Sequence, residues 1–120
     1  MANEIKTSIS ISVSKDGAKI SRQDSKSIDM TGESFYHAVQ NIATSEETLE
    51  AYELSNMDAA EKGYIFAKNL DSTNYIELGL TSSYTIKLKP KEFCLFRADG
   101  AIFAKANTAA CELEYIYIED

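Results

Sequence analysis

The sequence has few of the side chains on which most catalytic and metal sites depend. Among 120 residues there are two cysteines, no tryptophan and one histidine, His37. No HxH, HExxH or CxxC spacing occurs, so the pattern supports neither a Ser-His-Asp triad nor a zinc site. The five glycines stand singly, which argues against a glycine-rich phosphate loop. We predict no catalytic residue, no cofactor site and no metal site, and we expect His37 to be exposed or hydrogen-bonded.

Positive charge and long apolar runs are also scarce. Lys and Arg total 12 against 19 Asp and Glu, a formal net charge of -7, so a phosphate backbone would be repelled. No apolar run approaches the ~20 residues of a membrane span. The start, "MANEIKTSISISV", lacks the basic and continuous apolar regions of a signal peptide. We expect synthesis in the cytoplasm and no nucleic-acid or membrane partner.

The two cysteines, Cys94 and Cys111, are too few for a disulfide scaffold. Each follows the hydrophobic pattern of its segment, and free cysteine behaves as a small buried hydrophobe. We predict two buried free thiols, with a bridge between them as the alternative.

The first part of the chain alternates between apolar and polar residues. In "IKTSISISV" (5–13), the odd positions are mainly Ile and Val, and the even positions are Lys6 followed by serines. This period of two predicts a half-buried strand whose apolar side faces a core. "KDG" at 15–17 is a tight turn. The next segment, 18–30, predicts one or two short exposed strands anchored inward by Ile20, Ile28 and Met30.

The middle of the chain is less clear. "ESFYHAVQNIA" (33–43) suits a helix or a strand, and its aromatic and β-branched residues favour a strand. Thr44 with Glu47 fits a helix capping box, whereas "TLEAYEL" fits a strand. We predict a strand over 48–54, followed by a loop or a single helical turn over 57–62.

From Gly63 onward, short apolar segments alternate with turn residues. The predicted strands are "YIFAKNL", "YIEL", "YTIKLK", "FCLFRA", "AIFAK" and "CELEYIYIE". Such spacing without helical periodicity predicts an all-β fold. We therefore expect a single β domain over 1–120, an antiparallel, jelly-roll-like β-sandwich.

One octet is nearly repeated: "GYIFAKNL" (63–70) and "GAIFAKAN" (100–107) are thirty-seven residues apart. In each copy, Ile and Ala share one face of a strand while Phe and Lys share the other. Three explanations are open: an ancient duplication, similar packing demands, and a ligand signature used twice. The octet contains no acid, base or nucleophile, which weakens the last.

Acidic and oxygen-rich segments have structural interpretations as well as functional ones. Glycosidases need only two suitably spaced carboxylates. The acidic residues nevertheless cluster on two stretches that resemble solvated faces: Glu46, Glu47, Glu50 and Glu53, then Glu112, Glu114, Glu119 and Asp120. "NLDSTN" (69–74) offers oxygens to Ca²⁺ but lacks several carboxylates, so we predict a turn held by its own side chains.

The segments "GYIFAKNLDSTNYIELG" and "LKPKEFCLFRADGAIFAKANTAACELEYIYIED" resemble small virion structural proteins of tailed bacteriophages. The shared pattern is a Gly-led strand, an Asn-rich turn, a strand ending in Gly, a Pro-containing turn and a terminal Leu-Glu-Tyr strand. It covers about the last 58 residues, and 30–54 fits more loosely. Lys91 departs from it, because Gly is expected after Pro90 and a type II turn favours Gly there.

This resemblance implies a non-enzymatic virion protein, which decorates or cements a capsid as a homo-oligomer. Its partner would be the major capsid protein or another virion protein. Our alternatives are a head-tail (neck) or tail component, a carbohydrate- or small-ligand-binding β-sandwich, and a hydrolase with paired carboxylates. For the binding module the candidate residues are Tyr75 and Tyr84, aromatics beside oxygen-rich turns. The serine-rich first strand also suggests edge pairing with a neighbouring subunit.

Overall fold

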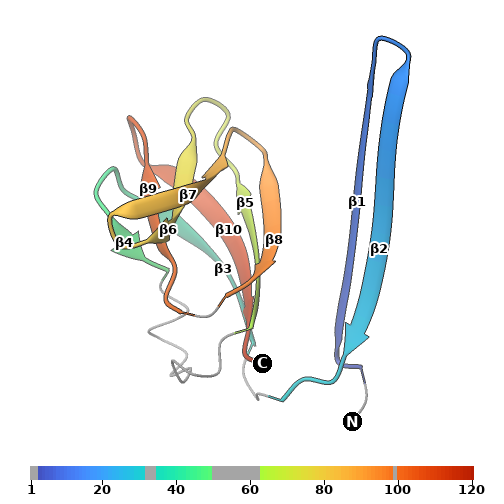
Figure 1. Ribbon diagram of the computed structural model, residues 1–120. Coiled ribbons are helices and arrows are strands. Elements are labelled where there is room, and N and C mark those ends of the chain that lie inside the picture. Colours follow the sequence, from blue (N-terminus) through green and yellow to red (C-terminus); the bar gives the residue numbers. More distant parts are fainter. Residues whose placement is uncertain (1–2, 32–34, 50–62, 99) are drawn as a thin grey trace. The chain divides into compact units, whose positions relative to one another are not determined.

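The computed structural model describes residues 3–31, 35–49, 63–98 and 100–120, and all regular elements within them are β-strands. The chain forms two compact units, Met1–Thr31 and Gly32–Asp120. Strand pairings are antiparallel throughout the described residues, so the all-β prediction is confirmed. The strands (Figure 1) are β1 (Ile5–Lys15), β2 (Ala18–Ile28), β3 (Phe35–Ile42), β4 (Glu47–Thr48), β5 (Tyr64–Asn69), β6 (Ile76–Leu80), β7 (Ser83–Leu88), β8 (Phe93–Arg97), β9 (Phe103–Ala106) and β10 (Cys111–Ile118).

The first unit is a long β-hairpin made of β1 and β2. Its two eleven-residue strands pair along their whole length, ending at Lys15 opposite Ala18. Asp16 and Gly17 connect them with φ angles of 52° and 83°. Two successive positive φ angles are characteristic of a type I′ turn, whose twist suits a hairpin and for which Asp-Gly is a preferred sequence. The predicted turn is confirmed, and one continuous strand follows it.

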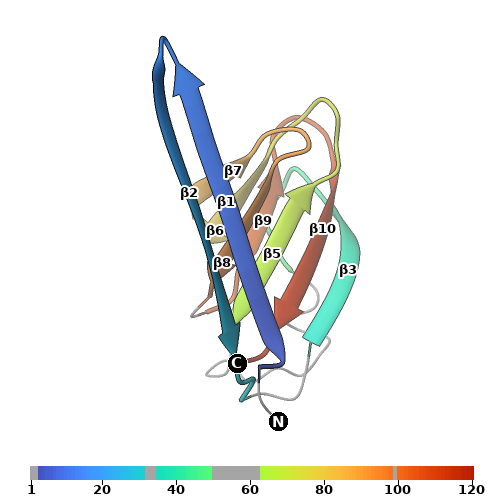
Figure 2. The same cartoon turned by 90° about the vertical axis from the view of Figure 1, so that its right-hand side faces the viewer.

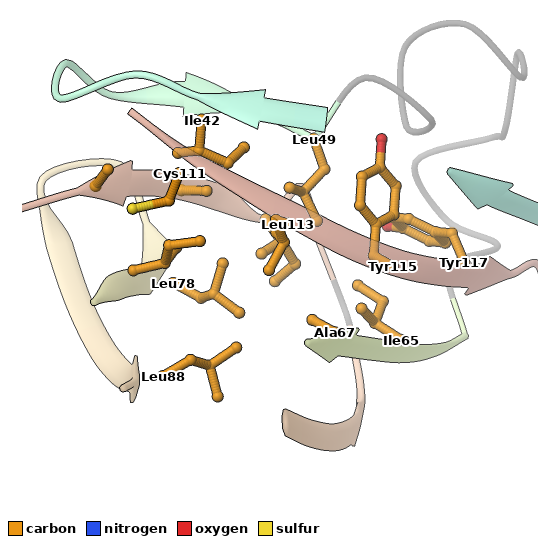
Figure 3. Packing of buried hydrophobic residues seen from close by; sticks show 14 of the residues in the cluster. Ile42, Leu49, Ile65, Ala67, Leu78, Leu88, Cys111, Leu113, Tyr115 and Tyr117 are labelled. Atoms are coloured by element: carbon orange, nitrogen blue, oxygen red, sulfur yellow. The ribbon is translucent and has the colours of Figure 1, made fainter. Parts of the chain in front are cut away.

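The second unit contains two four-stranded sheets. Their strand orders are β3-β10-β5-β8 and β4-β9-β6-β7, and Figure 2 shows β3, β10 and β5 side by side. Burial alternates along β5 and β10, as expected for strands with one face on a core. The buried side chains of both sheets form one cluster (Figure 3), which includes Ile42, Leu49, Ile65, Ala67, Ile76, Leu78, Leu88, Ala104, Leu113, Tyr115 and Tyr117. This unit is the predicted β-sandwich.

The two sheets of the second unit are related to each other. The relation pairs β3 with β7, β4 with β8, β5 with β9 and β6 with β10. Replacing each strand of the order β3-β10-β5-β8 by its counterpart gives β7-β6-β9-β4, which is the order of the other sheet read from its opposite edge. Adding 37 to the β5 numbers and subtracting 37 from the β10 numbers reproduces the β9–β6 pairing. The related pairs are Asn69↔Leu113 and Ala67↔Tyr115 in one sheet, and Ala106↔Ile76 and Ala104↔Leu78 in the other.

This relation explains the repeated octet. Its two copies form β5 and β9, which occupy equivalent places in the two sheets. The Ile and Ala of both copies are buried, and the Phe and Lys are partly exposed. Equivalent positions impose the same alternation and the same small residue at the centre, which both similar packing demands and a duplicated unit would produce.

Strand β6 extends two residues beyond its predicted end, through Gly79 and Leu80. The register with β7 shifts between Leu78 and Gly79, which marks a β-bulge. A Cβ on Gly79 would lie 2.3 Å from the carbonyl oxygen of Ser83. Glycine is needed here because two backbones approach closely.

The other segments of the second unit can be compared with their predictions. The strand interpretation of 33–43 is confirmed by β3. Of the strand predicted over 48–54, only Thr48 and Leu49 are among the described residues, and Thr48 belongs to β4. The loop or helical turn over 57–62 lies outside the described residues. A two-stranded hairpin has no core of its own, so the single domain over 1–120 stays a prediction.

Candidate interaction surfaces

The hairpin has one face that carries aliphatic side chains among charged ones and one face that is rich in serine. Directly opposite residues of an antiparallel pair share a face, so the register puts Ile20 on the same side as Ile9, Ile11 and Val13. We call these four residues the aliphatic patch; they are 56% to 71% exposed. The opposite face carries Lys6, Ser8, Ser10, Ser12, Ser14, Lys19, Ser21, Gln23, Ser25 and Ser27.

The exposure of the aliphatic patch corrects the sequence prediction. The alternation in 5–13 is as predicted, but its apolar side does not face a core, and Ile20 is not an inward anchor. Near the open end of the hairpin Ile5 is buried, and Ile28 and Met30 are partly buried. A period of two reports that one face differs from the other; it does not report whether a second layer covers that face.

The β3-β10-β5-β8 sheet is apolar on the side that faces away from the core. One row of register partners crosses all four strands, from His37 through Ile116 and Phe66 to Leu95. The Phe66 and Phe93 rings stack with centroids 6.3 Å apart. We call the aliphatic and phenylalanine residues on this side the outer apolar face: Phe35, Val39, Phe66, Phe93, Leu95, Ile116 and Ile118.

Three residues of the outer apolar face are largely exposed: Phe35 by 72%, Phe93 by 67% and Val39 by 57%. Our sequence analysis missed this surface, although a signal for it was present. Tyr115 to Ile118 are four successive apolar residues, a pattern found where both faces of a strand are apolar. A large apolar patch on a protein surface often marks an interaction site, whereas single exposed apolar residues are common on any protein.

Charge is distributed unevenly between the two units. Residues 1–31 contain five basic and four acidic side chains, a net charge of +1, whereas 32–120 contain seven basic and fifteen acidic ones, a net charge of -8; together these give the total of -7. On the face of the aliphatic patch lie Lys15, Arg22, Asp24 and Lys26. The side of the sheet that carries the outer apolar face also carries Glu112, Glu114, Lys68 and Arg97.

A polar hollow lies at the end of the sandwich where β6 turns into β7. It has a volume of about 530 Å³ and is lined by Thr44, Ser45, Glu46, Ser82, Tyr84 and Lys105. Its carboxylate, Glu46, accepts hydrogen bonds from Thr81 Oγ1 (2.5 Å), from the Ser82 amide (2.6 Å) and from the Tyr84 hydroxyl. These bonds lower the pKa of Glu46, and the bond to Glu46 raises the pKa of Tyr84 to about 12.

The two tyrosines proposed for ligand binding lie in different settings. Tyr84 lines the polar hollow, and Lys105 Nζ is 5.9 Å from the centre of its ring. Tyr75 has Lys87 Nζ over its ring at 4.1 Å, a cation–π contact. Both rings are partly buried, and Tyr84 is the one of the two that lines the polar hollow.

The oxygen-rich segment 69–74 is a turn held by its own side chains, as predicted. Asp71 Oδ2 accepts hydrogen bonds from the amides of Thr73 (2.8 Å) and Asn74 (2.6 Å), which lower the pKa of Asp71. Asn69 is buried and donates to the carbonyls of Asn74 and Leu88. Within the described residues no three His, Cys, Asp or Glu side chains form a group able to hold a metal ion.

The remaining acidic residues are more varied than predicted. Glu47 reaches inward to bond Gln40 Nε2 at 2.7 Å. Glu119 is buried, so the interpretation of the C-terminal acidic stretch as a solvated face is wrong for this residue. Asp120 pairs with Arg97 at 2.5 Å. Glu50 and Glu53 lie outside the described residues.

His37 and the cysteines occupy structural positions. His37 is exposed, and its Nε2 lies 2.8 Å from Glu114 Oε2, as predicted for an exposed or hydrogen-bonded histidine. Both cysteines are free thiols. Cys111 is buried and Cys94 is partly buried, and burial raises the pKa of Cys94 to about 11. Such thiols are poor nucleophiles at neutral pH.

Comparison with known proteins gave no match: no protein-family model, no curated protein and no solved structure is similar to the chain. In addition, the described residues contain no helix that could cross a membrane. The proposed functions rest on three surfaces described above: the aliphatic patch, the outer apolar face and the polar hollow.

Proposed function

We propose that this chain is a non-catalytic structural protein of a tailed-phage virion, a decoration or cement protein that binds the capsid surface as an oligomer. The observation that carries the proposal is the hairpin with its aliphatic patch exposed. An isolated two-stranded hairpin is marginally stable in water. A hairpin with eleven-residue strands and four exposed aliphatic side chains is suited to packing against another protein.

The sandwich suits the same role. We infer a jelly roll from its strand orders, because eight strands in two related four-stranded sheets correspond to two Greek keys. Jelly rolls occur in viral capsid and lectin domains, so the fold admits both an assembly role and a ligand-binding role. The aliphatic patch and the outer apolar face favour assembly, since apolar surface is what protein interfaces bury.

The virion setting follows from the resemblance of the last 58 residues to small phage virion proteins. Within a virion, the partner would be the major capsid protein, or a head-tail (neck) or tail protein in the alternative role. We propose no nucleic-acid partner, because the net charge of -7 opposes binding to phosphate.

The test is quantitative mass spectrometry of purified particles of the phage that encodes the chain. A capsid decoration protein is expected in hundreds of copies per particle, whereas a neck component is expected in about a dozen. Absence of the chain from washed particles would refute the virion proposal.

A second candidate function, a carbohydrate- or small-ligand-binding module, is favoured by the polar hollow. It combines an aromatic ring, a carboxylate and a lysine, Tyr84, Glu46 and Lys105, and such sites combine apolar rings with a few placed polar groups. Against it, Glu46 is already engaged by three donors of the β6–β7 turn. NMR titration with neutral and acidic oligosaccharides tests it: shifts confined to residues of the hollow support binding, and their absence at millimolar sugar refutes it.

A further inference from the structure

We propose that the aliphatic patch of one copy packs on the outer apolar face of a second copy of this chain. The inference rests on the proposed structural role and specifies the surfaces through which copies associate. Both surfaces are faces of antiparallel sheets, and two sheet faces pack by interdigitating side chains at a separation of about 10 Å. Both also expose large branched or aromatic side chains to solvent, which association would bury.

Charge favours a second copy as the occupant. The hairpin unit has a net charge of +1, and the unit that carries the outer apolar face has a net charge of -8. On the hairpin face of the aliphatic patch, Lys15, Arg22 and Lys26 outnumber Asp24, which pairs with Arg22. They would approach a side of the sheet that carries Glu112 and Glu114 beside Lys68 and Arg97. Such complementarity orients partners and speeds their association.

Size supports the same arrangement. Eleven residues of strand span about 35 Å, so a two-stranded ribbon about 10 Å wide covers roughly 350 Å² of a partner. A standard interface needs about 800 Å² from each partner. One hairpin alone falls short, whereas a copy that both donates and receives a hairpin approaches that area.

The contact joins two different surfaces, which constrains the assembly. A contact of this kind closes as a reciprocal pair or as a ring, or it continues as a filament. An exchanged pair satisfies both apolar surfaces of both copies. The Ser-rich face of the hairpin would remain in water, as its composition suggests.

The experiment measures the mass of the purified full-length chain by light scattering during size-exclusion chromatography, from 1 to 100 µM. We expect an oligomer. One variant, Ile11→Lys with Ile20→Lys, alters the aliphatic patch, and another, Phe93→Lys with Val39→Lys, alters the outer apolar face. Each should raise the dissociation constant at least tenfold. The matched control, Ser12→Lys with Ser21→Lys, adds the same charge to the polar face and should leave the mass unchanged.

Mixing the two interface variants gives the sharpest test. Each variant retains one intact surface, so an equimolar mixture can form one of the two contacts. We expect the mixture to associate more strongly than either variant alone and more weakly than the wild-type chain. Circular dichroism and thermal melts establish that all variants are folded, and all substituted residues are exposed. A second, milder pair, Ile11→Ser and Phe93→Ser, serves if a lysine variant fails to fold.

Three results would overturn the proposal. They are a monomeric wild-type chain at 100 µM, an effect of the Ser12/Ser21 control equal to that of the patch variant, and a mixture that associates no more strongly than either variant alone. A monomer would be the outcome if the hairpin covers the sheet of its own chain. The light-scattering test uses purified protein and addresses only the contact between copies. Mass spectrometry of particles addresses only the virion role, so each proposal can be refuted without the other.

Discussion

At the scale of single residues, polar side chains hold the turns. Glu46 anchors the β6–β7 turn and Asp71 anchors the β5–β6 turn, each by accepting backbone hydrogen bonds. Lys91 takes a φ of 67° after Pro90, and the Glu92 amide bonds the Lys89 carbonyl at 3.0 Å. These are features of a type II turn. Lys91 therefore adopts the backbone conformation that glycine usually takes at the third position of such a turn.

Lys91→Gly is expected to stabilise the sandwich. A left-handed conformation costs a non-glycine residue about 1–2 kcal/mol. Glycine removes this cost, but it also raises the conformational entropy of the unfolded chain, which offsets part of the stabilisation. The substitution also removes the exposed bond from Lys91 Nζ to the Leu70 carbonyl. We expect a net gain of about 0.5 kcal/mol, measured as a rise of ~2–4 °C in melting temperature.

The control for that substitution is Lys89→Gly, in the same turn but without a positive φ. It should give no gain. Equal stabilisation by both changes would contradict the strain argument.

Glu46 makes stability depend on pH in acid. Its pKa lies below the ordinary value of 4.5 because the Thr81 and Tyr84 hydroxyls and the Ser82 amide donate to its carboxylate. A lowered folded-state pKa contributes stability that is present above the unfolded pKa and is lost as pH falls through the folded one. We expect the melting temperature to fall between pH 5 and pH 3, and to fall less in Glu46→Gln.

The comparison for Glu46→Gln is Glu112→Gln, which alters an exposed carboxylate. If both variants keep the acid dependence of the wild type, the anchoring role of Glu46 is refuted.

At the scale of elements, close approach of strands decides where glycine is required. Gly79 sits at the bulge of β6, where a methyl group would meet the backbone of Ser83. Gly100 stands at the start of the second octet, where a methyl group would meet nothing within 4 Å. Both glycines are isolated residues in turn-like sequence. The sequence does not distinguish them, because the group that approaches Gly79 is the backbone of another strand, and strand pairing is decided only in the folded structure.

Gly79→Ala is therefore expected to destabilise the sandwich, by about 1–3 kcal/mol, because the new methyl group would overlap the Ser83 carbonyl. Gly100→Ala should be neutral or slightly stabilising. Urea unfolding of both variants measures the difference, and equal midpoints would contradict the structural assignment.

At the scale of the whole molecule, the hairpin and the sandwich should differ in hydrogen exchange. The sandwich amides of β5 and β10 belong to central strands over the core, so they should exchange slowly at every concentration. The amides of β1 and β2 should exchange rapidly at 1 µM and slowly at 100 µM, if the hairpin docks on a second copy. Protection of the hairpin that does not change with concentration would contradict docking between copies.

The sequence by itself determined the strands and most of their turns. Alternation identified β1, because side chains of successive residues point to opposite faces. Aromatic and β-branched content favoured a strand at β3, and short apolar segments between turn residues identified the strands after Gly63. The segment "NLDSTN" was predicted as a turn because Asp and Asn bond nearby backbone. The absence of a predicted catalytic motif likewise came from composition and spacing.

Only the tertiary structure decided which apolar faces are covered. The Ile and Ala of β5 lie in the core, whereas Ile11 and Ile20 of the hairpin face solvent, although both strands alternate in the same way. It also decided that β5 and β9 occupy related places in two sheets. Burial depends on contacts between residues far apart in the chain, and a local pattern carries no information about which distant segment lies opposite.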